Sequence, residues 1–403
     1  MSLNNLISVV TLVVSLSLVT EVLANSAAQE NTKLTKVTSD ERTIEHSYTA
    51  INIQSQKLGE GRELLVHLPD DYEKSSKRYP VLYLLDGKRH LPHAVAAENI
   101  LQNEALMPSS IIVAITNNPG TRNRDLSSGK DNFLGFISEE VFPFIAKEFR
   151  TSGHKTLFGH SMAGAFTMGV LASNPRSFDN YIAASPVIQM NNSKLISQFK
   201  ALQLSNKLGE KSLFISFGNA SAEGKAAAEA YNIFIKLMHD KPVKNLRWQQ
   251  QLMSEQVHMT TPYLTFYTGL SFGFLDYQSP RYSGYLDFKN RGEMAGLKAY
   301  YQDRSKKYSE SPEIPERTLR SLGLVIFDDG HQSKGLEILK LNMEQNPESF
   351  RAINALAQVY EDAKQPKQAL ATYHQGVELA IKNSSRNLAH FKRQVERLKQ
   401  TNQ

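Results

Sequence analysis

One serine stands in a motif whose residue types and spacing suit nucleophilic catalysis. Ser161 lies in the sequence G-H-S-M-A at positions 159–163, after two apolar residues and before a helix-like run at 163–173. Small residues two positions before and after the serine leave room for a strained strand-to-helix turn that exposes its hydroxyl. Such a turn also aims the amide of Met162 at the oxygen that becomes negative during attack on an ester. The pentapeptide alone fits an ordinary helix N-cap serine equally well.

A serine nucleophile needs a base, and His258 stands where one is expected. When the serine lies on a strand-to-helix turn of a parallel sheet, the base comes last in the chain, on the loop after the final strand. His258 follows a strand predicted at 246–252 across a short loop. A neutral imidazole there can accept the Ser161 proton and return it to the leaving alcohol.

Other histidines are candidates for lining the pocket around this pair. His90 and His93 lie near the end of another predicted strand, and we count His90 among the substrate-contacting residues. His160 adjoins the nucleophile and is also a candidate substrate contact, although we expect its side chain to point away from the base. The remaining histidines fit surface or packing positions.

The acid that would orient the base is less clearly marked. Glu223 is the carboxylate closest to the end of the strand predicted at 213–217, where the acid is expected, and we choose it. Glu255, three residues before His258, is the competitor. Glu223 would equally suit the first turn of a helix, where the helix dipole favours an acid. A serine–histidine pair oriented by a backbone carbonyl is the third possibility.

Two further groups would complete an ester-cleaving site. The second oxyanion donor is expected in the loop after the strand at 80–85, from the amide of Gly87 or Lys88, beside that of Met162. Arg122 and Arg124 lie in a polar loop and could present a guanidinium to a carboxylate or phenolate of the substrate. Pairing of these arginines within their own loop is equally compatible with the sequence.

Composition limits the classes of function. The chain has 403 residues, a formal net charge of +6 and no cysteine. Without cysteine there are no disulfides, thiolate metal sites or cysteine nucleophiles. The positive charge is spread along the chain rather than gathered in a basic block, so nucleic acid is not an expected partner. We expect neither a metal nor a cofactor.

The N-terminus has the pattern of a secretory signal. Residues 6–19 are almost entirely apolar, and small residues precede a cleavage site near Ala24. This run is short for a membrane span, so we assign 1–24 as a signal peptide and expect a periplasmic or secreted protein. Residues 1–5 lack the usual Lys or Arg, and a retained membrane anchor is the alternative. A polar, flexible segment is expected at 25–42.

Strands and helices alternate through a first domain at 43–277. This alternation predicts an α/β protein with a mostly parallel sheet covered by helices on both faces. Ser161 would then stand at a carboxyl end of a strand, where such sheets gather their chemistry. The predicted strands are 45–56, 62–68, 80–85, 110–115, the run leading to Ser161, 181–184, 213–217 and 246–252, and the predicted helices are 93–106, 133–149, 163–173, 222–238 and 262–274.

The remainder of the chain is purely helical. Residues 278–291, rich in Tyr, Ser, Gly and Pro, are assigned as a linker, and 292–403 as a small all-α domain. Within it Leu322-Gly323 recurs about 34 residues later as Leu356-Ala357, the period of tetratricopeptide repeats. Such helices could bind a protein partner or mediate self-association. A plain helical bundle would give the same weak pattern.

At this point the motifs resemble a known family. Five separated sequences occur in order, YPVLYLLDG at 79–87, RNRDL at 122–126, FLGFI at 133–137, FGHSMAG at 158–164 and ASP at 184–186. They are similar to the esterase branch of the α/β hydrolases, which includes esterase D, feruloyl esterases and the periplasmic esterases that open trilactone siderophores such as enterobactin.

The resemblance, which covers about 43–276, implies a role for each matched residue. It implies Ser161 as nucleophile, His258 as base, and Gly87 or Lys88 with Met162 as oxyanion donors. Ala163 stands where the family commonly has glycine, and alanine is small enough for the turn. The resemblance leaves the acid open, because siderophore esterases of this group can work with a serine–histidine pair.

These observations lead to one expected function and two alternatives. We expect a serine hydrolase that cleaves carboxylic esters through an acyl-enzyme, acting on a small-molecule ester such as a siderophore trilactone or a small acyl or aromatic ester. An acyltransferase of the same fold is the first alternative. A non-catalytic scaffold that uses the helical repeats to bind a partner is the second.

Overall fold

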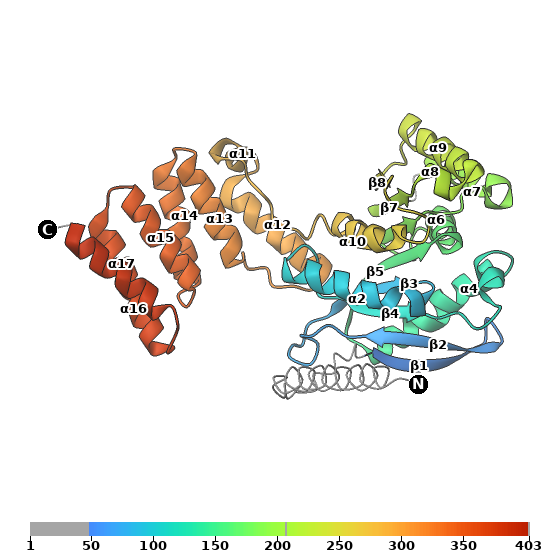
Figure 1. Ribbon diagram of the computed structural model, residues 1–403, viewed down its shortest axis with the longest axis horizontal. Coiled ribbons are helices and arrows are strands. Elements are labelled where there is room, and N and C mark those ends of the chain that lie inside the picture. Colours follow the sequence, from blue (N-terminus) through green and yellow to red (C-terminus); the bar gives the residue numbers. More distant parts are fainter. Residues whose placement is uncertain (1–47, 206–207, 402–403) are drawn as a thin grey trace, which may run out of the picture. The chain divides into compact units, whose positions relative to one another are not determined.

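An eight-stranded sheet is the framework of the protein (Figure 1). The computed structural model describes residues 48–205 and 208–401, so the predicted signal peptide and polar segment lie outside the described residues, and export stays a prediction. The strand order is β1-β2-β4-β3-β5-β6-β7-β8. The strands are β1 (Tyr48–Ser55), β2 (Glu60–His67), β3 (Tyr79–Leu84), β4 (Ile111–Ile115), β5 (Thr151–His160), β6 (Asn180–Ala184), β7 (Lys211–Phe217) and β8 (Leu246–Leu252).

The sheet is mostly parallel, as the alternation of strands and helices predicts. Only the β1–β2 and β2–β4 pairs are antiparallel, and all pairs from β4 through β3 to β8 are parallel. Successive side chains of β3 enter opposite faces of the sheet, Val81 and Tyr83 on one side and Leu82 and Leu84 on the other. Both faces are therefore apolar and both must be covered.

Helices cover the two faces. The first apolar layer receives side chains from α4 (Lys130–Gly135), η2 (Phe136–Val141), α5 (Phe142–Glu148), α6 (Met162–Ser173), α7 (Met190–Gln203) and α9 (Lys225–Asp240). The second receives them from α2 (Gly87–Asn103), α10 (Thr261–Gly273) and α12 (Glu293–Tyr308). The short helices α3 (Arg122–Leu126) and α8 (Ala220–Glu223) lie in loops at the carboxyl ends of strands.

Several helix bounds differ from the sequence prediction. Helix α2 begins at Gly87 rather than at 93, and it therefore contains Pro92. The single helix predicted at 133–149 is three segments with a π-helical turn at Phe136–Val141. The polar loop at 117–130 contains α3, and α7 was not predicted although Leu195, Phe199 and Leu202 follow helical spacing.

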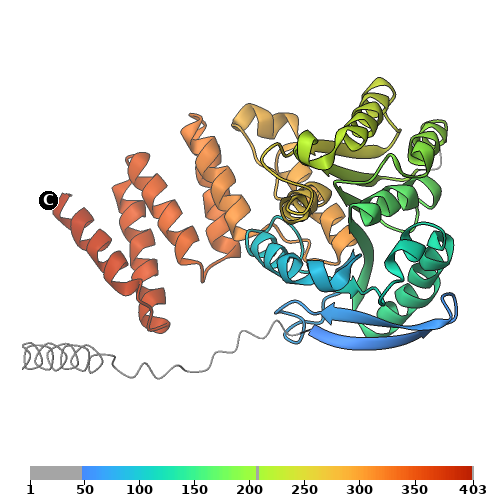
Figure 2. The same cartoon turned by 45° about the vertical axis from the view of Figure 1, so that its right-hand side comes forward.

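Helices alone form the C-terminal part (Figure 2). Helix α11 (Tyr285–Asn290) lies inside the segment predicted as a linker, and its Phe288 is fully buried. The helices that follow α12 are α13 (Glu316–Asp328), α14 (Gln332–Gln345), α15 (Phe350–Asp362), α16 (Pro366–Lys382) and α17 (Leu388–Thr401). Among the described residues no helix is long and apolar enough to span a membrane.

Equivalent helices of the C-terminal part recur at a constant interval. Helices α13 and α15 begin at Glu316 and Phe350, and α14 and α16 at Gln332 and Pro366, so each recurs after 34 residues. Gly335 allows α14 to approach α13 closely, since a Cβ there would lie 2.7 Å from the Phe327 backbone nitrogen. The tetratricopeptide assignment of this region stays a prediction.

Helix α12 joins the helical part to the sheet. Its last residue, Tyr308, is buried in the same apolar layer as Phe158 of β5 and Phe274. The Tyr308 hydroxyl donates to Asp276 Oδ1 at 2.9 Å, and the Tyr300 hydroxyl donates to the Asp276 carbonyl at 2.9 Å. Helix α12 is thus part of the covering of the sheet.

Candidate active site

Ser161 occupies a strained turn between β5 and α6. Its φ of 62° and ψ of −120° lie in a region that side-chain-bearing residues rarely adopt. The neighbouring small residues explain how the turn is tolerated. A Cβ at Gly159 would lie 2.2 Å from the Ala163 carbonyl oxygen, so only glycine fits there. Ala163 is itself fully buried, which shows that this alanine fits the turn.

Three side chains from different strand ends meet at this turn. His258, on the loop between β8 and α10, has Nε2 2.9 Å from Ser161 Oγ. Its Nδ1 lies 2.6 Å from Glu223 Oε2, at the end of α8 after β7. The competing carboxylate, Glu255, makes its hydrogen bond with Ser254 instead. Serine, imidazole and carboxylate therefore form one hydrogen-bonded line.

Glu223 is a buried carboxylate with several donors. Its side chain is 3 % exposed. Oε1 accepts from the Ser185 hydroxyl at 2.6 Å and from the Gly218 amide at 3.2 Å. Burial alone would raise the pKa of Glu223, but hydrogen bonds from His258, Ser185 and Gly218 hold it below its ordinary value. The carboxylate is therefore ionised at neutral pH.

Two hydroxyl side chains around this line were missed by sequence reasoning. Ser185 follows β6 with a φ of 38° and is buried. Its hydroxyl lies 2.9 Å from that of Thr261, which in turn donates to the His258 carbonyl at 3.0 Å. The sequence signal for Ser185 is its position directly after a buried strand at the carboxyl edge of the sheet.

The prediction that His160 points away from the base was wrong. The His160 and His258 rings lie 4.6 Å apart, and His160 Nε2 lies 2.8 Å from the His258 carbonyl oxygen. His160 is the last residue of β5 and His258 lies on the loop after β8, and this loop reaches back along the carboxyl edge of the sheet to His160. Burial, and to a lesser extent the nearby His258, lowers the pKa of His160 to about 4. The His160 ring is neutral at physiological pH.

His90 is buried beneath His160 and His258, and it does not line the cavity at Ser161. It is 1 % exposed, and its Nδ1 lies 2.9 Å from Nε2 of His93. Burial lowers the pKa of His90 to about 3 and that of His93 to about 4. The prediction that His90 contacts substrate is therefore not supported by its position.

Ser161 opens into a polar cavity of about 420 Å³. The cavity is lined by Asp86, Lys88, Arg89, Asn117, Arg122, His160, Ser161, His258 and Met259. Arg122 holds Asp86 with two hydrogen bonds of 2.6 and 2.8 Å, and Lys88 pairs with Glu63 at 2.8 Å. Within residues 48–205 and 208–401 no carboxylate pairs with Arg89. The cavity therefore has an excess of positive charge.

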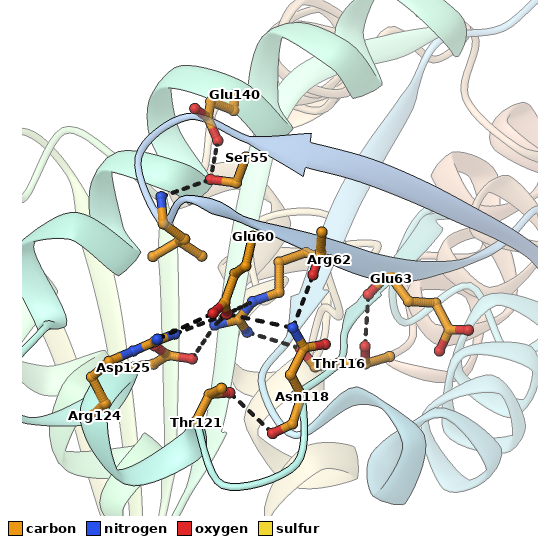
Figure 3. A network of polar contacts seen from close by, with 12 residues as sticks. Ser55, Glu60, Arg62, Glu63, Thr116, Asn118, Thr121, Arg124, Asp125 and Glu140 are labelled. Carbon is orange, nitrogen blue, oxygen red and sulfur yellow. Dashed lines mark hydrogen bonds and ion pairs between the residues drawn. The ribbon is translucent and has the colours of Figure 1, made fainter.

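Arg124 is not among the residues that line this cavity. It belongs to a separate network of polar contacts (Figure 3). Its guanidinium bonds Glu60 at 2.9 and 3.1 Å and Asp125 at 2.7 and 2.8 Å. The fully buried Arg62 also contacts both carboxylates. Arg124 thus pairs within its own loop and with β2, while Arg122, two residues earlier, lines the cavity.

The residues expected to stabilise an oxyanion stand at two helix starts. Met162 is the first residue of α6, and Gly87 and Lys88 are the first two of α2. The first amides of a helix have no partner within it and can bind an anion. The glycine is needed because α2 approaches β4 closely, since a Cβ at Gly87 would lie 2.6 Å from the Ala114 carbonyl carbon.

No group of three or more His, Asp or Glu side chains in the described part of the chain is arranged to hold a metal ion. The strained serine, the buried imidazoles and the hydrogen-bonded carboxylate are arranged for proton transfer. The chemistry that these residues can perform is attack by a hydroxyl whose proton passes to a histidine held by a carboxylate.

Comparison with known proteins shows the family of the chain. The family model described as "Putative esterase" matches residues 55–259, about half of the chain, and the chain belongs to this family. The matched residues include both Ser161 and His258 as well as Glu223.

Curated relatives match shorter segments. The siderophore enterobactin esterase of Emericella nidulans is 44 % identical over 82 residues, which are 20 % of this chain and 27 % of that protein. The ferri-bacillibactin esterase BesA of Bacillus subtilis is 30 % identical over 142 residues, 28 % of this chain and 49 % of that protein. The chain thus spans less than two thirds of the length of these relatives.

Solved structures share the fold. An IroE-like serine hydrolase from Shewanella oneidensis has a TM-score of 0.59 at 22 % identity and covers 74 % of this chain and 99 % of its own. A protein from Capnocytophaga ochracea has a TM-score of 0.59 at 15 % identity and covers 86 % of this chain and 99 % of its own. The 74 % and 86 % of this chain that the two structures cover are larger shares than the half matched by the family model, so each likeness extends into the helical part.

Proposed function

We propose that this protein is a carboxylic ester hydrolase with Ser161 as its nucleophile. The observation that carries the proposal is the line from Ser161 Oγ to His258 Nε2 at 2.9 Å and from His258 Nδ1 to Glu223 Oε2 at 2.6 Å. A serine in a strained turn, hydrogen-bonded to an imidazole that a buried carboxylate orients, is the arrangement that activates a hydroxyl for acyl transfer.

In this mechanism His258 accepts the Ser161 proton as the hydroxyl attacks the ester carbonyl. The tetrahedral intermediate places negative charge on the former carbonyl oxygen, which the Met162 amide and the first amides of α2 would bind. His258 then gives its proton to the leaving alcohol, and an acyl-enzyme forms. A water molecule, deprotonated by the same imidazole, hydrolyses this intermediate and restores Ser161.

Two observations favour an ester that carries negative charge. Lys88, Arg89 and Arg122 line the cavity. Asp86 is the one carboxylate of this lining, and its negative charge is neutralised by Arg122. The Emericella nidulans and Bacillus subtilis relatives are named as esterases of siderophores. We therefore propose a siderophore ester, such as a catecholate trilactone, as the substrate class. Small acyl or aromatic esters, or transfer of the acyl group to an alcohol, would use the same residues.

A fluorophosphonate probe and a panel of esters test the proposal. We expect the protein to be labelled and to hydrolyse members of the panel, and Ser161→Ala to lose both properties while keeping its fold by circular dichroism. A wild-type protein that neither takes up the probe nor cleaves any ester would favour the non-catalytic scaffold. The panel includes a ferric catecholate trilactone beside neutral p-nitrophenyl esters, which tests the substrate class. Faster cleavage of the neutral esters would contradict a siderophore ester as the substrate.

A further inference from the structure

The main-chain carbonyl of His258 is held from two sides. His160 Nε2 lies 2.8 Å from this oxygen, and the Thr261 hydroxyl lies 3.0 Å from it. His160 and Thr261 are 2 % and 0 % exposed, so both donor side chains are held in place by buried surroundings. His258 belongs to a loop between β8 and α10, and its ring position depends on how that loop is fixed.

Proton counting shows that the two donors are not equivalent. A hydroxyl has one proton, so the Ser185 and Thr261 hydroxyls have two protons between them. They make three contacts, from Ser185 to Glu223 at 2.6 Å, between the two hydroxyls at 2.9 Å, and from Thr261 to the His258 carbonyl at 3.0 Å. The Glu223 carboxylate attracts the Ser185 proton most strongly. The Thr261 proton is therefore shared between Ser185 and the carbonyl.

The imidazole N–H of His160 is not shared in this way, because it faces the His258 carbonyl. A carbonyl oxygen only accepts, so the nitrogen that faces it, Nε2, must carry the proton. Because the ring is neutral, Nδ1 is then without a proton. His160 is also the last residue of β5 and is paired with Ala184 of β6, so its ring projects from a fixed backbone.

We propose that His160 is a positioning residue, whose imidazole N–H holds the main-chain carbonyl of His258 and thereby keeps the His258 ring in line with Ser161. This role rests on the proposed function. The neighbouring ring also has to be uncharged for the role to work, because a second cation 4.6 Å away would oppose the imidazolium that His258 becomes during the reaction. The residue before the nucleophile thus fixes the base.

The test compares two substitutions with a matched control. His160→Leu removes the donor, and His160→Gln restores a side-chain N–H of similar reach. His154→Leu is the control, because His154 is a buried histidine of the same strand whose Nδ1 has no hydrogen-bond partner in the described structure. All three are assayed by kcat and KM with p-nitrophenyl acetate and by the rate of fluorophosphonate labelling.

We expect His160→Leu to lower kcat roughly 10- to 100-fold with little change in KM, as misplacement of a catalytic group does. His160→Gln should recover most of this loss, and His154→Leu should resemble wild type. A folded His160→Leu variant with unchanged kcat would overturn the proposal. A loss confined to KM, or a His160→Gln variant as impaired as His160→Leu, would do the same.

An independent measurement covers the case in which His160→Leu does not fold. Long-range ¹H–¹⁵N spectra of the wild-type protein at pH 7 report which ring nitrogen carries the proton. We expect the neutral Nε2–H form for His160, and a protonated Nδ1 would overturn the proposal. This spectrum does not depend on turnover. An inactive wild-type protein would therefore contradict the proposed function, while the tautomer would still decide the contact with His258.

Discussion

At the scale of single residues, Glu223 is the member of the site with the sharpest expected effect. In Glu223→Gln the carboxylate that holds His258 Nδ1 at 2.6 Å becomes an amide of the same shape. The amide no longer selects the tautomer that accepts the Ser161 proton, so we expect kcat to fall about 10²- to 10⁴-fold. Steady-state kinetics with a p-nitrophenyl ester measure this loss.

Glu255→Gln is the matched control for that substitution. Glu255 is the other carboxylate near His258 in the sequence, yet its side chain is exposed and bonds Ser254 rather than the imidazole. We expect its kinetics to match those of wild type. Equal effects of the two substitutions would show that Glu223 does not orient the base.

At the scale of elements, the turn from β5 into α6 depends on one glycine. A Cβ at Gly159 would lie 2.2 Å from the Ala163 carbonyl oxygen and 2.7 Å from Thr167 Oγ1. Gly159→Ala must therefore shift the start of α6, and we expect a loss of about 1–3 kcal/mol in the free energy of unfolding together with loss of activity. Urea unfolding measures the change.

Gly169, within α6 itself, provides the comparison. A Cβ there would meet no atom within 4 Å. Because alanine suits a helix interior better than glycine, we expect Gly169→Ala to raise the free energy of unfolding by about 0.5–1 kcal/mol. A Gly159→Ala variant as stable and active as Gly169→Ala would contradict the close approach at the turn.

At the scale of the whole molecule, buried histidines make the fold sensitive to acid. Burial lowers the pKa of His93, His154 and His160 to about 4 and that of His90 to about 3, all below the ordinary 6.5. Below about pH 6.5 these histidines bind protons in the unfolded chain, whereas in the folded chain they stay neutral down to a lower pH. We therefore expect the free energy of unfolding to fall as pH decreases from about 6.5 toward 4.

One buried carboxyl acts in the opposite direction. Burial raises the pKa of Glu98 to about 8, so its contribution to stability is present below the ordinary value of 4.5 and is lost as pH rises toward 8. Four histidines outweigh this one group below pH 6.5. Urea unfolding at several pH values tests the balance, and His154→Leu should make the decline with acid less steep. A stability that does not change between pH 7 and 5 would contradict this account.

The sequence by itself determined the order of the strands along the chain and the positions of the principal candidate residues. Apolar strands alternating with helices predicted the mostly parallel sheet, because such strands must be covered on both faces. The position of Ser161 after one strand, Glu223 after another and His258 after the last placed all three at the same sheet edge. These features depend on local pattern and chain order, which a sequence contains.

Only the tertiary structure decided which side chains meet. Arg122 and Arg124 are two residues apart with the same chemistry, yet one lines the cavity and the other bonds Glu60 on β2. Likewise, His160 turns toward the base, and Ser185 reaches Glu223 across neighbouring strand ends. Side-chain direction at the end of a strand depends on contacts between segments far apart in the chain, and no local pattern encodes those contacts.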